Sequence, residues 1–219
     1  HQKSSLVSQE KRVKSLFNQE FKHLSDGNIL ILSSRLDLHF IDPYYEADMQ
    51  GKKRVHLDDK FLPISADIAF SSWLRKLKHL VSTAEKKGVH VIVMGEMPVF
   101  KGTAESVDPW LCSTEWYRPS ISHSCPQTFS VDREFTLKRT AKIRSSLKDL
   151  ASKHNNLSIF NSMEIVCPAE KCRAHLNGKL IFRDTDHLSR EGAFLLDKSL
   201  TTHIKSLQKY ESKTNLRNC

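Results

Sequence analysis

The feature that most constrains the fold is a regular alternation of short apolar runs with longer amphipathic segments. Residues 28–32 and 89–94 are apolar runs of strand length, as is typical of strands covered on both faces. Between them, residues 65–87 carry apolar side chains at helical spacing. Parallel strands need such a helical crossover, so the pattern predicts an α/β fold, a three-layer α/β/α sandwich with a parallel sheet.

The remaining segments continue the alternation. Gly88 is expected to end the helix over 65–87. The other expected elements are helices over 5–24 and 131–154, strands over 157–160 and 179–182, and a last helix that runs through Leu207. Residues from about 100 to 130 are expected to form a long irregular stretch. At 219 residues with 39% hydrophobic content, residues 1–219 are expected to form one domain.

The charge balance and the start of the chain bear on the partners and on the location. The formal net charge of +9 admits a nucleic acid, an acidic membrane surface or an anionic polysaccharide. However, the basic residues are spread over the expected helices and form no single tract, so no nucleic-acid partner is expected. No apolar run is long enough to span a bilayer. The chain begins at His1 without a signal-peptide pattern, which we interpret as a piece of a longer precursor.

Two residues between the expected strand 179–182 and the last helix have catalytic chemistry. Asp184 and His187 are three residues apart, and on a helical turn that spacing puts both on one face. The Asp184 carboxylate would then accept a hydrogen bond from the near ring nitrogen of His187, and the far nitrogen would act as a base. The alternative is structural: Ser189 or Asp186 only caps the last helix.

Three stretches resemble one family. Asp184-Thr185-Asp186-His187-Leu188-Ser189, with Gly192-Ala193 behind it, resembles the last conserved block of the SGNH hydrolase superfamily. The version it resembles most is that of the extracytoplasmic domains fused to membrane-bound sugar O-acyltransferases. Residues 30–40 resemble their strand that ends in small-small-Arg, and residues 91–98 resemble the next strand with its Gly-x-x-Pro ending. The resemblance implies a flavodoxin-like SGNH fold and a Ser-His-Asp acyl-enzyme without metal or cofactor, in which Asp184 orients His187.

The family's nucleophile, the Ser of a Gly-Asp-Ser block on the central strand, is absent from the 219 residues. We prefer the explanation that this block lies upstream of His1, since a parallel sheet without its central strand leaves unpaired edges in the core. The alternatives are that Ser33 or Ser34 is the nucleophile, or that the domain only binds. Arg35 stands near the place of the family's oxyanion-hole Asn, and is expected either to contact the oxyanion or substrate or to form a surface ion pair.

The resemblance also implies a biological role. It implies O-acyl transfer, most often of acetyl, to hydroxyls of a cell-surface polysaccharide in the periplasm or another extracytoplasmic space. An upstream transmembrane acyltransferase domain would supply the acyl group. The alternatives are a secreted carbohydrate esterase and a non-catalytic domain that binds a carbohydrate or a partner. In the latter, Trp110, Trp116 and Tyr117 would stack on sugar rings.

The chain has five cysteines, Cys112, Cys125, Cys167, Cys172 and Cys219. Two disulfides in an oxidising compartment would account for four of them, with Cys112 and Cys125 flanking one loop and Cys167 and Cys172 closing another. A zinc site is the weaker reading, because the four-residue gap has no matching second pair. The similar acyltransferase-linked domains carry a cysteine pair just upstream of the Asp-x-Asp-His block, which favours a Cys167–Cys172 disulfide.

Overall fold

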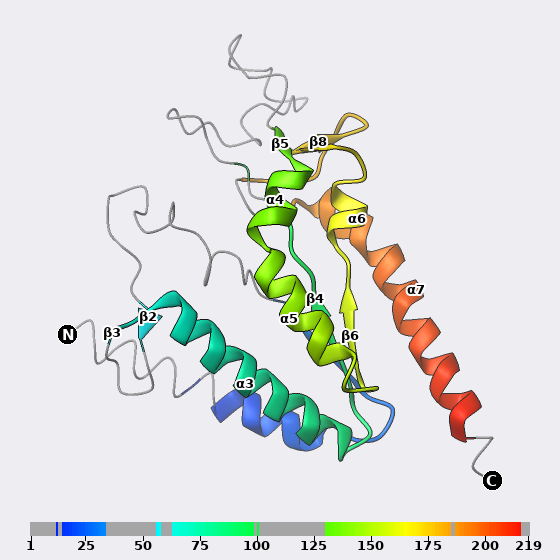
Figure 1. The fold of residues 1–219 in the computed structure, drawn as a ribbon. Coiled ribbons are helices and arrows are strands. Elements are labelled where there is room, and N and C mark those ends of the chain that lie inside the picture. Colours follow the sequence, from blue (N-terminus) through cyan, green and yellow to red (C-terminus); the bar gives the residue numbers. More distant parts are fainter. Residues whose placement is uncertain are drawn as a thin grey trace.

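A three-stranded parallel sheet forms the centre of the described structure (Figure 1). The computed structural model describes residues 12, 15–33, 56–57, 63–98, 100, 130–184 and 187–215. The sheet has the order β1-β4-β6, with β1 at Ile29–Leu32, β4 at His90–Met94 and β6 at Leu157–Phe160. All five residues of the central strand β4 are buried. The predicted α/β class with a parallel sheet is confirmed.

Helices cover both faces of this sheet. On one face, α3 (Ala66–Glu85) and α5 (Ala141–Ala151) pack over a core that includes Val91 and Val93. On the other face, α7 (Arg190–Asn215) packs over a second core that includes Ile92. Successive residues of β4 therefore enter the two cores alternately, as the pleat of a strand requires. Figure 1 shows α7 on the side of the sheet away from α3.

The segment predicted as a helix over 65–87 forms α3, with both of its ends fixed locally. The hydroxyl of Ser65 accepts a hydrogen bond from the Ile68 N–H at 3.3 Å, which caps the N-terminus. After the C-terminus, Gly88 has a φ of +67°, and a Cβ there would lie 2.0 Å from the Asp26 carboxylate. Gly88 is thus the predicted helix stop, and only glycine fits this close approach.

The prediction of one helix over 131–154 is wrong. The segment begins as β5 (Ser130–Asp132), which pairs antiparallel with β7 (Lys171–Arg173), and continues as α4 (Arg133–Arg139) before α5. The helices separate at Thr140, whose φ and ψ are −91° and 4°. The Thr140 N–H still donates to the Thr136 carbonyl at 3.0 Å, and the Thr140 hydroxyl donates to the same carbonyl at 2.9 Å, a side-chain bond that often bends helices. Apolar periodicity runs through both helices and did not reveal this break.

The prediction of a strand over 179–182 leading to Asp184 is only half right. β9 (Lys179–Leu180) pairs antiparallel with β8 (His175–Leu176) in a separate hairpin, not in the parallel sheet. The turn is Asn177–Gly178, with φ values of 51° and 75°. An Asn-Gly pair is a strong hairpin signal because both positions favour positive φ, although no hairpin was predicted from it here.

The remaining described elements are short. β2 (His56–Leu57) pairs antiparallel with β3 (Pro63–Ile64) just before α3. α6 (Met163–Val166) follows the end of β6 and contacts α7. Within the predicted helix over 5–24, the structure describes residue 12 and residues 15–23 as helical. In the part of the chain that the structure describes, no helix has the length and apolarity needed to cross a membrane.

Strand β1 departs from the expectation of burial on both faces. It pairs in parallel with β4, Ile29 opposite His90, and among the described strands it has no neighbour on its other edge. Ile31 is 40% exposed. Beside β1 lies an apolar groove of about 780 Å³ lined by Phe17, Phe21 and Trp73, among others. This edge of the sheet is therefore both open and apolar within the described structure.

A polar cluster ties α7 to the sheet. The Ser158 hydroxyl on β6 lies 3.1 Å from His90 Nε2 on β4 and 3.0 Å from His203 Nε2 on α7. His90 is buried, and burial first and the neighbouring His203 second lower the pKa of His90. Burial also lowers the pKa of His175. These shifts favour the neutral imidazole in the folded chain.

Acid should therefore weaken the fold. Because the pKa of His90 is lower in the folded chain than in the unfolded chain, the unfolded chain binds a proton first as the pH falls. The free energy of unfolding is therefore highest above about pH 6.5, and it decreases as the pH drops toward the pKa of the folded chain. The slope for one histidine is at most about 1.4 kcal/mol per pH unit. Urea unfolding at pH 7.5 and 5.5 measures the loss. In His90→Gln this loss of stability between the two pH values should be smaller, and the part due to His175 should remain. A loss as large as in the parent would contradict the role of His90.

Candidate active site

Asp184 and His187 lie in a loop that is closed just before α7. Phe182 and Leu188 form a β-bridge, and the Arg183 N–H donates to the His187 carbonyl at 2.8 Å. α7 begins only at Arg190. The expectation that the pair shares a helical face is therefore wrong, because the two side chains meet across a bridged loop.

The structure nevertheless brings the two side chains into direct contact. His187 Nδ1 lies 2.9 Å from Oδ2 and 3.0 Å from Oδ1 of Asp184. The His187 backbone N–H also donates to Asp184 Oδ1 at 2.7 Å, so the carboxylate is fixed by the same residue whose ring it orients. With Nδ1 directed at a carboxylate, the proton-accepting position of the ring is Nε2, on the far side. The catalytic role of the pair remains a prediction.

The two side chains differ in exposure. The Asp184 side chain is 24% exposed and the His187 side chain is 66% exposed. Arg183 Nη2 lies 3.8 Å from Asp184 Oδ2, so a guanidinium is also near the carboxylate. A mostly covered carboxylate beside an exposed imidazole is an arrangement in which the ring is held from one side and reachable from the other.

Ser189 caps α7, the structural role considered for it above. Its hydroxyl accepts a hydrogen bond from the Gly192 N–H at 3.0 Å and donates to the Leu180 carbonyl. Its N–H donates to the Ile181 carbonyl at 2.8 Å. The Ser189 cap and the Asp184–His187 pair are therefore compatible. The cap ties the start of α7 to β9, and the pair lies in the loop between β9 and α7.

Gly192 allows α7 to approach this loop closely. A Cβ at Gly192 would lie 2.2 Å from the Ile181 carbonyl oxygen and 2.9 Å from Leu188 Cδ2. The first of these contacts is with backbone, which cannot rotate away. In the sequence Gly192 stands out only as part of a motif, which does not reveal this packing role.

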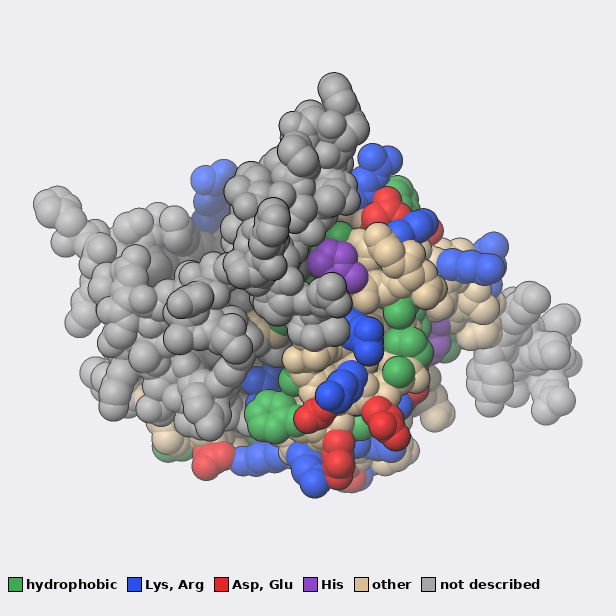
Figure 2. All heavy atoms as spheres, turned by 90° about the horizontal axis from the view of Figure 1, so that it is seen from above, with side chains coloured by type: hydrophobic (Ala, Val, Ile, Leu, Met, Phe, Trp, Pro, Cys, Tyr) green, Lys and Arg blue, Asp and Glu red, His purple; other side chains and the backbone are tan. Residues whose placement is uncertain are grey.

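The loop lies toward the end of the sheet where the parallel strands finish. The Phe182 ring contacts Phe100 edge-on, with centroids 4.9 Å apart, and Phe100 follows the carboxyl end of β4. α6, which follows β6, contacts α7. Figure 2 looks onto this end from above and shows basic and acidic side chains interspersed over the described surface. In open α/β sheets, ligands bind beyond the carboxyl ends of the strands.

Cys167 and Cys172 form a disulfide, as the resemblance implied. Both residues are fully buried. The bond joins the end of α6 to β7, and β7 leads through the β8–β9 hairpin to Asp184. It therefore braces the segment that delivers the Asp–His loop. Among the described residues, no group of three or more His, Cys, Asp or Glu is placed to hold a metal ion.

Several predicted site residues fall elsewhere. Ser33 directly follows β1, is exposed, and lines the apolar groove. The others lie outside the described residues: Ser34, Arg35, Cys112, Cys125, Cys219, Asp186 and the loop aromatics Trp110, Trp116 and Tyr117. Their predicted roles remain predictions.

A parallel α/β sheet with an Asp–His pair toward its carboxyl end is compatible with acyl-transfer or esterase chemistry. The family model for the SGNH domain fused to AT3 domains matches residues 4–201. The chain therefore belongs to this SGNH family, whose activity is of the acyl-transfer or esterase type. Neither the curated proteins nor the solved structures include a match to the chain.

The close packing at Gly192 generates a prediction about stability. Gly192→Ala should lower the free energy of unfolding by about 1–3 kcal/mol, because the methyl group forces α7 away from Ile181. The matched control is Glu191→Ala, one residue earlier, where an exposed ion pair with Lys179 is lost at a cost of about 0.5 kcal/mol. Urea unfolding measures both. Equal costs for the two variants would show that α7 does not depend on this contact.

Proposed function

We propose that this domain transfers an O-acyl group, most often acetyl, to hydroxyls of a cell-surface polysaccharide through an acyl-serine intermediate. The observation that carries the proposal is the contact of His187 Nδ1 with both carboxylate oxygens of Asp184, at 2.9 and 3.0 Å. Such a contact fixes the tautomer in which Nε2 can take a proton, and the carboxylate stabilises the imidazolium that forms. Membership of a family fused to acyltransferase domains supports the acyl chemistry.

The steps follow from this geometry. His187 Nε2 takes the serine proton as the serine oxygen attacks the acyl carbonyl, and returns it to the leaving group as the acyl-serine forms. In the second half, His187 takes the proton of a sugar hydroxyl as that oxygen attacks the acyl-serine. The serine leaves with the proton, and the sugar ester is the product. Attack by water instead gives hydrolysis, so transfer depends on a well-positioned acceptor.

The nucleophile, in this proposal, comes from a strand that precedes residue 1. Three features support its place beside β1: the absence of a neighbouring described strand on that edge, the 40% exposure of Ile31, and the apolar groove alongside. A parallel strand added there would end level with Ser33, so a serine after it would lie at the carboxyl edge of the sheet. Arg35 is proposed to contact the oxyanion or the substrate nearby.

The same proposal places the domain in an extracytoplasmic compartment, tethered to a transmembrane domain that delivers the acyl group. The Cys167–Cys172 disulfide supports an oxidising compartment, since such bonds are rare in the cytosol. The description of the family as a domain fused to AT3 domains supports the tether.

The base and its orienting carboxylate can be tested by substitution. In a chain extended upstream to include the nucleophile block, His187→Ala and Asp184→Asn should each lower kcat for p-nitrophenyl acetate by about 10³-fold, because proton transfer is lost or the wrong tautomer is held. His23→Ala removes an exposed histidine at the end of the helix formed by residues 15–23 and should leave kcat unchanged.

Each outcome of this assay has a clear meaning. Activity in the 219-residue chain that falls with Ser33→Ala or Ser34→Ala would show that one of these two serines, and not an upstream serine, is the nucleophile. An extended chain with no turnover, or with turnover that His187→Ala does not change, would contradict catalysis and favour a carbohydrate- or partner-binding domain.

The proposed strand position has its own test in stability. In the 219-residue chain, Ile31→Asp should cost less than about 1 kcal/mol, because the Ile31 side chain is partly in solvent. In the extended chain the same change should lower the free energy of unfolding by at least about 2 kcal/mol more, since the added strand would bury the unpaired carboxylate of the introduced aspartate. Urea unfolding of the four proteins gives this double difference. Equal costs in the two chains would show that the upstream strand does not cover β1.

A further inference from the structure

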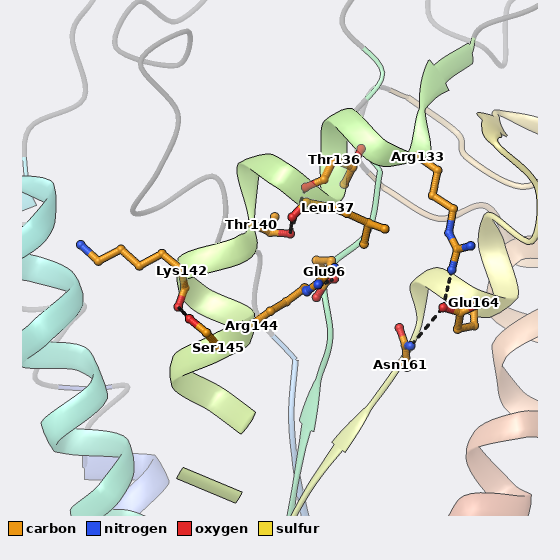
Figure 3. Close-up of polar contacts among 10 residues, drawn as sticks. All are labelled: Glu96, Arg133, Thr136, Leu137, Thr140, Lys142, Arg144, Ser145, Asn161 and Glu164. Carbon is orange, nitrogen blue, oxygen red and sulfur yellow. Dashed lines mark hydrogen bonds and ion pairs between the residues drawn. The ribbon is translucent and has the colours of Figure 1, made fainter. Parts of the chain in front are cut away.

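A second cavity, of about 380 Å³, lies at the carboxyl ends of β4 and β6, on the face that α5 covers. Its floor is apolar and is formed by Leu137, Leu147 and Ile159. Its polar lining comes from the strand ends and from the helices beside them (Figure 3). The volume falls within the range of small-molecule sites in proteins, and the place is one where open α/β sheets bind ligands.

A mostly buried carboxylate stands at the strand end. Glu96 follows β4, and its side chain is only 11% exposed. Arg144 reaches toward it from α5, as Figure 3 shows, and its Nε lies 3.6 Å from Glu96 Oε1. That separation is an ion pair without a hydrogen bond. The guanidinium is thus held near the carboxylate, and its N–H groups can donate hydrogen bonds to a ligand.

The opposite side of the cavity carries a fixed amide and a second carboxylate. Asn161 directly follows β6, and its Nδ2 donates to Glu164 Oε1 on α6 at 3.4 Å. Arg133, at the start of α4, pairs with the same Glu164 oxygen. Figure 3 shows Asn161 and Glu164 across from Arg144 and Glu96. The polar groups therefore line the cavity from two sides, and on each side they are held by contacts with one another.

The balance of charge and of hydrogen-bonding groups indicates the chemistry of the ligand. Glu96 and Glu164 are matched by Arg144 and Lys148, so the formal charges of the lining cancel. A charged ligand gains no net attraction from such a lining. A neutral group with adjacent hydroxyls does fit, because each hydroxyl donates to a carboxylate and accepts from a guanidinium or an amide. The apolar floor suits the C–H face of a sugar ring.

We propose that this cavity binds one neutral sugar unit, with neighbouring hydroxyls held by Glu96, Arg144 and Asn161. Its lining includes the carboxyl ends of β4 and β6, the end of the sheet toward which Asp184 and His187 also lie, so we infer that a longer bound sugar chain extends from the cavity toward them. Its assignment as a subsite for the acyl acceptor rests on the proposed function. The binding of a sugar does not depend on the proposed function, and it can be measured without turnover.

Saturation-transfer NMR on the 219-residue chain provides the test, with the methyl glycosides of glucose, galactose and N-acetylglucosamine as probes. At least one should bind saturably, and Arg144→Ala and Asn161→Ala should each weaken it about tenfold, as expected for loss of a hydrogen bond to a charged or fixed polar group. The matched control is Lys142→Ala, also on α5, whose ion pair with Asp67 lies outside the cavity lining. Lys142→Ala and His187→Ala should bind as the parent does.

Asn161 is exposed, so its substitution keeps the test valid even where Arg144→Ala disturbs the fold by removing the Arg144–Glu96 ion pair. Absence of binding by all three glycosides would overturn the proposal. So would equal binding by the parent and Asn161→Ala, or a response to inorganic phosphate alone. Binding that depends on Asn161, in a domain whose extended form shows no ester turnover, would support the sugar site and refute the proposed function.

Discussion

The approach of α7 to the carbonyl of Ile181 sets the position of the Asp184–His187 pair. The loop that carries the pair is tied at both ends: by the hairpin before it and by the Ser189 cap after it. The cap needs the helix start to lie directly against β9, and the missing side chain of Gly192 permits that distance. The loop is thus held by backbone contacts and a cap, while its two functional side chains are left to contact each other.

The remainder of the fold supports this contact from a distance. The His90–Ser158–His203 cluster joins the middle of α7 to β4 and β6, and the disulfide braces the segment between α6 and the hairpin. Because β4 is buried throughout and supplies both cores, its register fixes the two helical layers relative to each other. The second cavity uses the same framework, since Glu96 and Asn161 directly extend the ends of β4 and β6.

The sequence predicted the layers well because they depend on local patterns. The apolar run before Gly95 and the periodicity of α3 were sufficient for β4 and for the helix beside it. The break at Thr140 could not be found in that way, because it is a change of backbone dihedral angles at a single residue and leaves the apolar spacing intact. The Asp184–His187 contact was predicted from spacing on a helix and is formed in a bridged loop instead. The cavity at Glu96 brings together four separate segments, which no local pattern reveals.

The central claim is that His187 serves a serine that enters the sheet beside β1. The most direct measurement is labelling of the extended chain with a fluorophosphonate, followed by peptide mapping by mass spectrometry. We expect a single label on a serine upstream of residue 1, lost in His187→Ala, and no label on the 219-residue chain. Label on Ser33 or Ser34, or label that persists in His187→Ala, would contradict it.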